Sequence, residues 1–371
     1  MTPSRLLWQN YAIIGGSVIT ASSSQISFPV RRLRDPIRSN KWRSAAGWTV
    51  VAGFNDELDF TEGVTGDATA TITAGTYATG DDMATAVQTA VNAAATDNTY
   101  TVTYSASTFK FTIARATGSE TFGLEFFTGG SVQSCGLDLG FSVTSDHTGF
   151  TTYTGDLAAY QSRHYITFDL GAIFDVAAFL VLDHNAALGG TFTVQAAAAE
   201  GDLLTAPDYA AETDSLDNLD SIRALLPSPA QTFRYWALVI DDVQNDDGFS
   251  EVGIIYAGEW LELDLPARGL SKSPLDYSDV TYADQGAAWQ DRRQRTRRFE
   301  YKFQILAESK IDEVDSAATS ILTGGHLFFQ RDPEADSGQV QYMVLAAMPN
   351  IQQNAGADRW EVSLTLQEAL G

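Results

Sequence analysis

The fold is decided by RRFEYKFQIL at residues 297–306 and ESKIDEVDSAATSILTGG at residues 308–325. Phe299, Tyr301 and Phe303 alternate with polar and charged residues in the first segment, and this period of two predicts a half-buried strand. In the second segment the apolar residues share one face of a helix: Ile311, Val314, Ala318, Ile321 and Leu322. Gly324 and Gly325 then end that helix.

Three further strands are predicted after this helix, from HLFFQRDPEADSG (residues 326–338), QVQYMVLAAMPNI (339–351) and RWEVSLTLQEAL (359–370). The last strand has one apolar face, made by Trp360, Val362, Leu364 and Leu366. The order from residue 297 to residue 367 is therefore β-α-β-β-β, with one helix to cover a sheet. None of these segments carries a catalytic motif.

Length and charge limit the classes of protein to consider. A chain of 371 residues is too long for one ordinary core, so we expect two or three domains. The 23 Lys and Arg residues against 47 Asp and Glu residues give a net charge of −24. This balance argues against a nucleic-acid partner, because phosphate contacts require a basic surface. It argues equally against adsorption to an anionic membrane.

A single cysteine, Cys135, excludes an intramolecular disulfide and a cysteine-based zinc site. Because it stands beside Gly136 and Leu137, we expect it to be a small buried apolar residue. No window has the roughly 18 uninterrupted apolar residues of a membrane span. Polar residues interrupt the apolar N-terminus MTPSRLLWQNYAIIGGSVITASS, so we expect a first strand rather than a secretory signal, and assembly in the cytoplasm.

Residues 53–154 predict a small α+β module of their own. Met83, Val87 and Val91 mark the buried face of a helix, and Ala84, Ala90 and Ala94 flank that face. Asp81 or Asp82 is the expected N-cap. A hairpin with its turn at residues 105–108 follows. Its alternating apolar residues are Tyr100, Val102 and Tyr104 on one strand, and Phe109, Phe111 and Ile113 on the other.

The residues on either side of this module resemble discoidin-like, galactose-binding-type β-sandwiches. The resemblance begins with ITASSSQISFPVRRLRDPIRSNKWRSA, a Ser-rich strand end, a loop and then Trp42. It continues with the Asp-Leu-Gly of residues 169–171 and the Arg-Tyr-Trp of residues 234–236. The resemblance implies one discontinuous sandwich made of residues 1–52 and 155–262, with residues 53–154 inserted in a loop, where an insertion costs little free energy.

The other two parts resemble components of tailed bacteriophages. The inserted module is similar to a β-α-β-β module found in phage virion proteins. Residues 263–371 look like an extended arm followed by a tail-tube-type, ring-forming domain. Together the parts imply a distal-tail or tail-tip (baseplate) protein of a virion. A neighbouring minor tail protein or fibre adaptor fits the same parts, because the sandwich here precedes the ring domain.

This resemblance also implies the partners. The chain would assemble with itself as a ring, a hexamer in preference to a trimer, and with tail-tube, tail-hub and fibre proteins. Host surface glycans are a further expected partner. Sequence-specific nucleic acid and membrane insertion are not expected, and neither a cofactor, a metal nor an enzymatic activity is implied.

Candidate sites are few. None of the four histidines has a partner at metal-ligand spacing. Asp241 and Asp242, followed by Asp246, Asp247 and Gly248, do not meet the EF-hand register. We take the cations Arg292, Arg293, Arg295, Arg297 and Arg298 as the basic cluster of the chain and expect an intersubunit contact there. Three aromatic residues are candidates for stacking on a sugar ring: Trp48, Tyr153 and Tyr160.

Two other classes stay open beside the tail-tip interpretation. A sugar-binding module, or a receptor-binding tail protein that recognises host glycans, would use the same sandwich. A glycan-cleaving tail hydrolase would need two carboxylates at a suitable separation, which the sequence alone cannot place. Phosphate-binding loops and nucleophile elbows are absent from the sequence.

Overall fold

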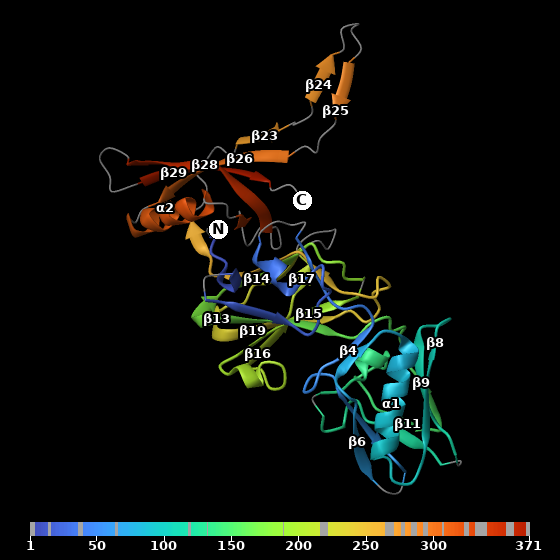
Figure 1. Cartoon of the computed structure of the whole chain (residues 1–371). Helices are drawn as coiled ribbons and strands as arrows, with labels where there is room; N and C mark the ends of the chain where they lie inside the picture. The colour runs from blue at the N-terminus through green and yellow to red at the C-terminus, as the bar shows by residue number, and fades with distance from the viewer. Residues whose placement is uncertain are drawn as a thin grey trace.

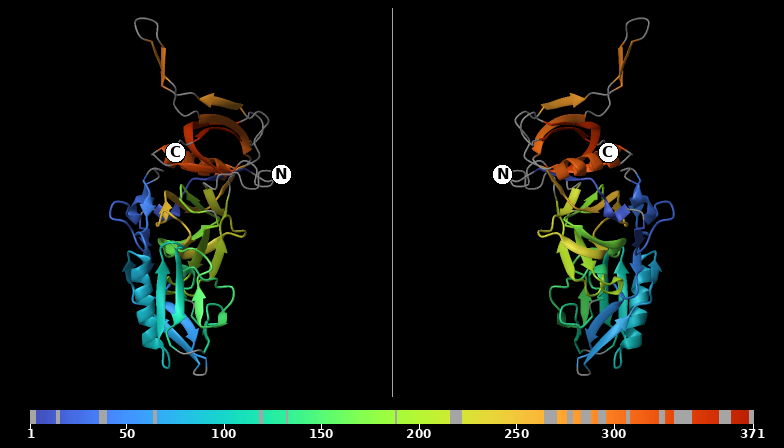
Figure 2. Two further views of the ribbon diagram at one scale, coloured as in Figure 1. Left: turned by 90° about the vertical axis from the view of Figure 1, so that its right-hand side faces the viewer. Right: turned by 90° about the vertical axis from the view of Figure 1, so that its left-hand side faces the viewer.

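The computed structural model describes residues 4–13, 16–35, 40–63, 66–117, 120–131, 133–187, 189–215, 222–263, 271–275, 279–282, 288–291, 296–305, 308–322, 326–330, 340–353 and 360–368. These residues form 29 strands, two α-helices and four 3-10 helices. Figures 1 and 2 show an elongated molecule with the module of residues 53–154 at one end, a sandwich in the middle and the C-terminal sheet at the other end. The predicted mainly β fold with few helices is confirmed.

The middle part is a sandwich of two antiparallel sheets with the strand orders β16-β15-β19-β13-β2 and β17-β18-β14-β21. Phe168, Phe179 and Trp236 fill the space between the sheets, and Trp42 is fully buried beside them. The strands are β2 (Val18–Ala21), β13 (His164–Val176), β14 (Ala178–Leu182), β15 (Thr191–Ala197), β16 (Tyr209–Glu212), β17 (Asp214–Ser215), β18 (Ile222–Leu225), β19 (Gln231–Asp241) and β21 (Ile254–Gly258). A separate pair joins β3 (Trp42–Arg43) to β20 (Glu251–Val252).

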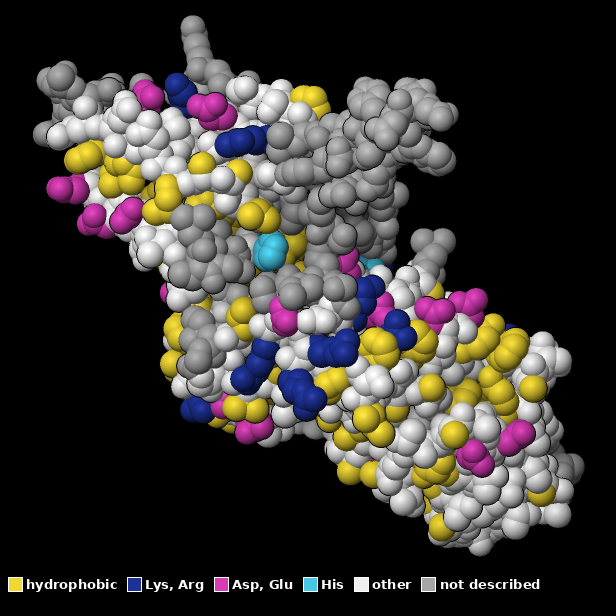
Figure 3. Space-filling view, turned by 45° about the horizontal axis from the view of Figure 1, so that its top comes forward, with side chains coloured by type: hydrophobic (Ala, Val, Ile, Leu, Met, Phe, Trp, Pro, Cys, Tyr) yellow, Lys and Arg dark blue, Asp and Glu magenta, His cyan; other side chains and the backbone are white. Residues whose placement is uncertain are grey.

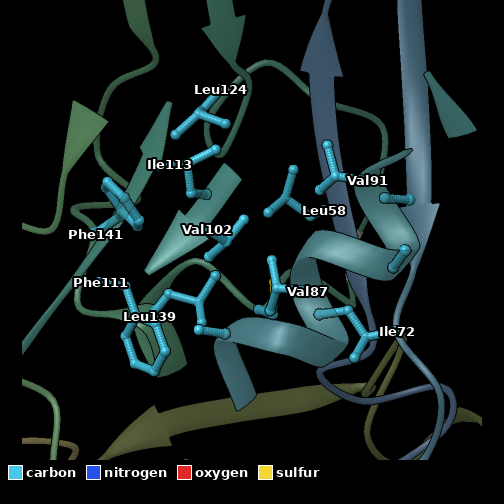
Figure 4. Packing of buried hydrophobic residues seen from close by; sticks show 14 of the residues in the cluster. Leu58, Ile72, Val87, Val91, Val102, Phe111, Ile113, Leu124, Leu139 and Phe141 are labelled. Atoms are coloured by element: carbon cyan, nitrogen blue, oxygen red, sulfur yellow. The ribbon is translucent and has the colours of Figure 1, made fainter. Parts of the chain in front are cut away.

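The inserted module has its own core. Helix α1 (Gly80–Ala94) packs on β6 and β8, and Figure 4 shows Val87 and Val91 pointing toward Leu58 and Val102. The strands are β4 (Trp48–Val50), β5 (Glu57–Thr61), β6 (Asp67–Thr71), β7 (Gly75–Tyr77), β8 (Tyr100–Ser105), β9 (Lys110–Arg115), β10 (Phe122–Leu124), β11 (His147–Phe150) and β12 (Thr152–Thr154). The predicted helix and hairpin are present, and Cys135 is buried in this core as expected.

The N-cap of α1 differs from the prediction. Thr79, not Asp81 or Asp82, caps the helix, and its hydroxyl oxygen accepts a hydrogen bond from the backbone N–H of Asp82 at 3.1 Å. The Thr79 hydroxyl also bonds the Asp82 carboxylate at 2.7 Å. A side chain at the N-cap reaches the N–H of the third helical residue, and this geometry selects the residue before the helix.

The C-terminal part has the predicted β-α-β-β-β order, in which helix α2 (Glu308–Leu322) covers one face of a curved sheet (Figure 2). Ile311, Val314 and Ala318 of the helix pack against the apolar face of β26 and β28. The elements are β23 (Ser271–Leu275), β26 (Thr296–Ile305), β27 (Leu327–Gln330), β28 (Val340–Gln353) and β29 (Trp360–Glu368). The segment predicted as an extended arm is partly paired, because β23 joins the edge of this sheet.

A hairpin projects beyond this sheet. Strands β24 (Asp279–Tyr282) and β25 (Ala288–Asp291) pair only with each other within the described residues. Figure 1 shows them extending away from the rest of the molecule. The hairpin therefore presents its backbone edges to the surroundings.

The first strand joins the C-terminal sheet and not the sandwich. Strand β1 (Ser4–Leu7) pairs with β27 on one side and with β22 (Leu261–Leu263) on the other. The seven-stranded order is β22-β1-β27-β28-β29-β26-β23. The sequence-based division placed both β1 and β22 with the sandwich, because a strand of three or four apolar residues does not reveal its pairing partner. The chain therefore enters the C-terminal sheet both before the first sandwich strand, through β1, and after the last one, through β22.

An apolar interface also holds the sandwich against this sheet. Leu180 and Tyr256 of the sandwich pack with Leu7 of β1, and with Phe328 and Tyr342 of the C-terminal strands. The rings of Tyr256 and Phe328 lie 5.0 Å apart, edge to face. Burial of these large side chains stabilises the arrangement of the two parts. No helix among the described residues has the length and apolarity needed to cross a membrane.

Candidate functional site

A groove lies where the sandwich meets the C-terminal sheet and the start of α2. Two adjoining hollows form it, of about 530 and 260 Å³, and both are lined by Glu259, Trp260 and Lys310. The larger hollow is closed by Arg5, Glu262 and residues 226–230 of the sandwich. The smaller one is lined by the N-terminal segment that leaves β1, including Trp8 and Tyr11.

The N-terminal segment is held tightly against β21. The Asn10 side-chain amide donates to the Ile255 carbonyl at 2.9 Å, and its oxygen accepts from the Ala257 N–H at 3.1 Å. The Tyr256 hydroxyl donates to the Trp8 carbonyl. A Cβ at Gly258 would lie 2.3 Å from the Gln9 carbonyl oxygen, so only glycine permits this close approach. The aromatic residues of this segment are therefore fixed in position.

Aromatic residues form part of the lining of the groove. Tyr11 stacks on Phe174 at 4.4 Å between ring centroids, and Trp8 is half-buried against the core of the C-terminal part. Trp260 is 9% exposed and packs in the interface between the two parts. Burial raises the pKa of Tyr11, and the carboxylates of Glu259 and Asp175 add to that rise. Glu259 therefore lies close enough to Tyr11 to act on the ionisation of its hydroxyl group.

Other residues of the lining are charged. Arg5 pairs with Glu262 at 3.0 Å, and Lys310 pairs with Glu313 at the same distance. Glu259 is exposed, and no ion pair is recorded for it within the described residues. Two buried donors, the Trp260 indole Nε1 and the Arg5 Nε, have no hydrogen-bond acceptor in that part of the chain. Both nitrogens are buried away from solvent, so they are not contact points for a ligand in the groove.

The aromatic residues predicted to stack on sugar lie elsewhere. Trp48 and Tyr153 are 4% and 6% exposed and belong to the core of the inserted module, so their ring faces are not open to a sugar. The Trp48 ring packs against Phe111, and its indole N–H donates to the Asp138 carbonyl at 3.1 Å. Tyr160 is half-buried and packs on Phe109 at 4.5 Å. Stacking at Trp48 and Tyr153 is therefore wrong as a prediction, because both rings are needed in the core.

The predicted arginine contact is only partly described. Arg292, Arg293 and Arg295 lie outside the described residues. Arg297 pairs with Glu368 of the adjacent strand β29 and lies over the Phe299 ring. Arg298 is half-buried on β26 opposite Gln367. Since Arg297 has a partner within its own chain, it is less available to a neighbouring subunit.

The acidic segment after β19 has internal partners. The Asp242 carboxylate accepts hydrogen bonds from the Ala187 N–H at 3.1 Å and from the Asn245 side-chain amide at 2.9 Å. Asn245 also donates to the Asn185 carbonyl at 2.9 Å. No group of three or more His, Cys, Asp or Glu side chains suited to a metal ion occurs among the described residues.

Sequence reasoning missed the residues of the groove. Arg5 and Trp8 are some 250 residues from Glu259 in the chain and come close to it because β1 pairs with β22. The available signal was the segment GEWLEL at residues 258–263, which places Trp260 between two carboxylates. A tryptophan flanked by acids at a domain junction is a combination that ligand sites use.

Comparison with known proteins gives only weak similarities. No family model matches the chain, and no curated protein matches it. Among solved structures, the family 32 carbohydrate-binding module of Clostridium perfringens NanJ in complex with galactose gives a TM-score of 0.28 at 6% identity, covering 69% of this chain and 98% of that one. The C. perfringens module CpGH89CBM32-6 gives 0.19 at 11% identity, covering 26% and 69%. CpGH89CBM32-5, in complex with GalNAc-β-1,3-galactose, gives 0.19 at 14% identity, covering 26% and 66%. TM-scores this low do not transfer a ligand to this chain.

Proposed function

We propose that the chain is a glycan-binding protein that holds a saccharide in the groove between the sandwich and the C-terminal sheet, without cleaving it. The observation that carries this proposal is a groove lined by the half-buried ring of Trp8 and by the exposed carboxylate of Glu259, which forms no ion pair within the described residues. Sugar hydroxyls both donate and accept hydrogen bonds. They can therefore donate to the Glu259 carboxylate and accept from the Lys310 ammonium, both of which line the groove.

The aromatic part of the lining supports the same class of ligand. The face of a pyranose ring is apolar and its rim is polar, so it matches a groove whose lining contains both aromatic and charged residues. Trp8, which is half-buried, supplies the aromatic surface, and Lys310 with Glu313 supplies part of the polar lining. The segment that carries Trp8 is hydrogen-bonded to β21. Little conformational entropy would therefore be lost there when a ligand binds.

A glycan array followed by titration tests the proposal. We expect the full chain to retain at least one saccharide, and Trp8→Leu and Glu259→Gln each to weaken binding about tenfold or more. Glu212→Gln, an equal change at an exposed position of β16, is the matched control and should bind as the unchanged chain does. If no saccharide is retained at millimolar concentration, or if the groove variants bind unchanged, the proposal is wrong.

A role as a virion subunit is the second candidate, in the form of a distal-tail or tail-tip protein. The projecting β24–β25 hairpin and the open edge strand β23 favour it, because both offer unpaired backbone groups to a neighbouring subunit. Replacing residues 279–291 by a short Gly-Ser linker should leave the monomer folded and should abolish assembly with tail components. Unchanged incorporation of this variant into particles would count against the hairpin as an assembly element.

A further inference from the structure

The sandwich carries a second concentration of positive charge. Residues 31–43 hold six of the 23 Lys and Arg residues of the chain and only one acid, Asp35. The described members are Arg31, Arg32, Arg34, Lys41 and Arg43, named here the arginine patch. On the face drawn in Figure 3, Lys and Arg side chains gather over the middle of the molecule. Because the chain has a net charge of −24, this local excess of cations suggests that they contact an acidic partner.

Aromatic stacking holds the guanidinium groups of the patch in place. Arg32 and Arg43 lie over the same ring, that of Phe28, at 5.0 and 4.1 Å from its centroid. Arg43 also lies 4.9 Å from the centroid of Phe249. Arg43 and Lys41 share the carboxylate of Glu251. These contacts preorganise the cations, so less side-chain entropy is lost when a partner binds.

Part of the patch has no acidic partner. Arg31 and Arg34 are exposed, and neither they nor Arg32 forms an ion pair within the described residues. Arg34 donates to the Ser17 carbonyl. Within the described residues, the patch therefore keeps positive charge that no carboxylate neutralises.

An exposed apolar residue stands beside these cations. Ile26 is 99% exposed, at the tip of a turn closed by the Phe28 N–H and the Gln25 carbonyl at 3.0 Å. The turn is tied to β3, because the N–H of Gln25 bonds the Arg43 carbonyl at 2.9 Å and the N–H of Arg43 bonds the Phe28 carbonyl. A fixed isoleucine next to arginines is typical of a protein interface rather than of a site for a soluble anion.

The inserted module presents the complementary surface. An open hollow of about 350 Å³ is lined by Asp59, Asp67 and Glu125, named here the acidic hollow. No ion pair involves these three carboxylates within the described residues. Burial raises the pKa of Glu125, and the charges of Asp67, Asp146 and Asp59 add to that rise. Phe127, 65% exposed, lies beside Thr128 on the rim.

We propose that the arginine patch of one copy of this chain docks on the acidic hollow of a second copy. The inserted module, residues 53–154, contains 12 Asp and Glu residues and only two Lys and Arg residues, so its charge suits the patch. Ile26 and Phe127 supply the apolar contact that accompanies the charges. The two surfaces are different, so the contact is heterologous, and copies add head to tail into a ring or a filament. This inference goes beyond glycan binding and uses none of the groove residues.

Sedimentation of the full chain tests the proposal. We expect the average mass to rise above 40.1 kDa with protein concentration at low salt. It should return to the monomer value near 1 M salt, where the Debye length falls to about 3 Å. Arg31→Glu with Arg32→Glu, and separately Asp67→Lys with Glu125→Lys, should each weaken self-association about tenfold or more. The control Lys110→Glu with Lys302→Glu makes the same charge change elsewhere and should associate as the unchanged chain does.

Mixing the two reversed variants gives the decisive result. Each variant is defective alone, but together they restore opposite charges at every contact, so we expect the mixture to associate again. Melting curves identify any variant that does not fold. If a variant does not fold, the salt dependence of self-association by the unchanged chain tests the proposal instead. A chain that stays monomeric at all salt concentrations overturns the proposal. So does a patch variant that associates normally while losing retention on heparin, which would assign the patch to an anionic polysaccharide.

Discussion

Arg163 of the sandwich and Asp138 of the inserted module form a buried ion pair that joins these two parts. The Arg163 side chain donates through Nε to one Asp138 oxygen at 3.3 Å, and its backbone N–H donates to the other at 2.5 Å. A further bond runs from Arg163 to the Ser134 carbonyl at 2.6 Å. The Asp138 side chain is only 1% exposed. Burial raises the pKa of Asp138, and the guanidinium of Arg163 opposes that rise.

The first prediction concerns this pair. Arg163→Met removes the cation and leaves a buried carboxylate, which is expected to cost about 3–5 kcal/mol in the free energy of unfolding. Without Arg163 the pKa of Asp138 rises further, so the folded variant takes up a proton that the unfolded chain releases. The loss should therefore be larger at pH 8 than at pH 5. Urea unfolding at both pH values measures this difference.

The double variant Asp138→Leu with Arg163→Met is the control for this prediction. It removes both charges and keeps most of the packing volume, so we expect it to be more stable than Arg163→Met alone. An equal loss of stability in the two variants at both pH values would show that the pair acts through packing and not through charge.

The second prediction concerns removal of the inserted module. Gly47 N–H bonds the Gly248 carbonyl at 3.3 Å and Tyr160 N–H bonds the Val243 carbonyl at 2.8 Å, so both ends of the module attach to one sandwich loop. Replacing residues 48–159 by a short Gly-Ser linker should give a soluble chain that unfolds cooperatively. Replacing residues 55–152 leaves Trp48 and Val50 without their core and should give a less stable product. Thermal unfolding compares the two deletions.

Some of this structure could be predicted because its signal is local. Two patterns depend only on residues that are close together in the sequence. They are the alternation of Phe299, Tyr301 and Phe303 and the helical spacing of Ile311 and Val314. Those elements form as predicted. The pairing of β1 with β27 joins segments more than 300 residues apart, and nothing in SRLL states which sheet it enters. Pairing of short strands is set by tertiary packing and not by propensity.

The sites were harder to predict, for a physical reason. The identity of an aromatic residue does not reveal whether it is buried or exposed, so the sequence predicts Trp48 and Tyr153 at the surface although both lie in the core. The groove depends on Arg5 and Trp260 meeting through long-range pairing. By contrast, the arginine patch is visible in RRLRDPIRSNKWR at residues 31–43 once the local charge is counted.

The third prediction tests the cap of α1. Thr79→Ala removes the hydroxyl that accepts from the Asp82 N–H, and this should lower the free energy of unfolding by about 1 kcal/mol. Thr79→Ser keeps the cap and should change stability much less. Thr85→Ala is a control on the same helix, since the Thr85 hydroxyl only bonds the Asp81 carbonyl one turn earlier. Equal losses for Thr79→Ala and Thr85→Ala would contradict a capping role.

The last prediction concerns Asp241 at the end of β19. Burial raises the pKa of Asp241 to about 6, with Arg163 opposing and Asp138 and Asp242 adding to the rise. The folded state therefore holds a proton that the unfolded state has already released, and stability falls as the pH rises from about 4 to about 6. Above pH 6 the full penalty is present. One pKa unit corresponds to about 1.4 kcal/mol, so we expect Asp241→Asn to stabilise the chain by about 1–3 kcal/mol at pH 7.5. That gain should shrink toward zero as the pH falls to about 4.

Asp246→Asn, the same change at an exposed position of the same segment, is the control and should not show this pH dependence. Denaturant unfolding between pH 4 and pH 8 measures both variants, and a gain for Asp241→Asn that does not vary with pH would rule out titration of Asp241 as its cause.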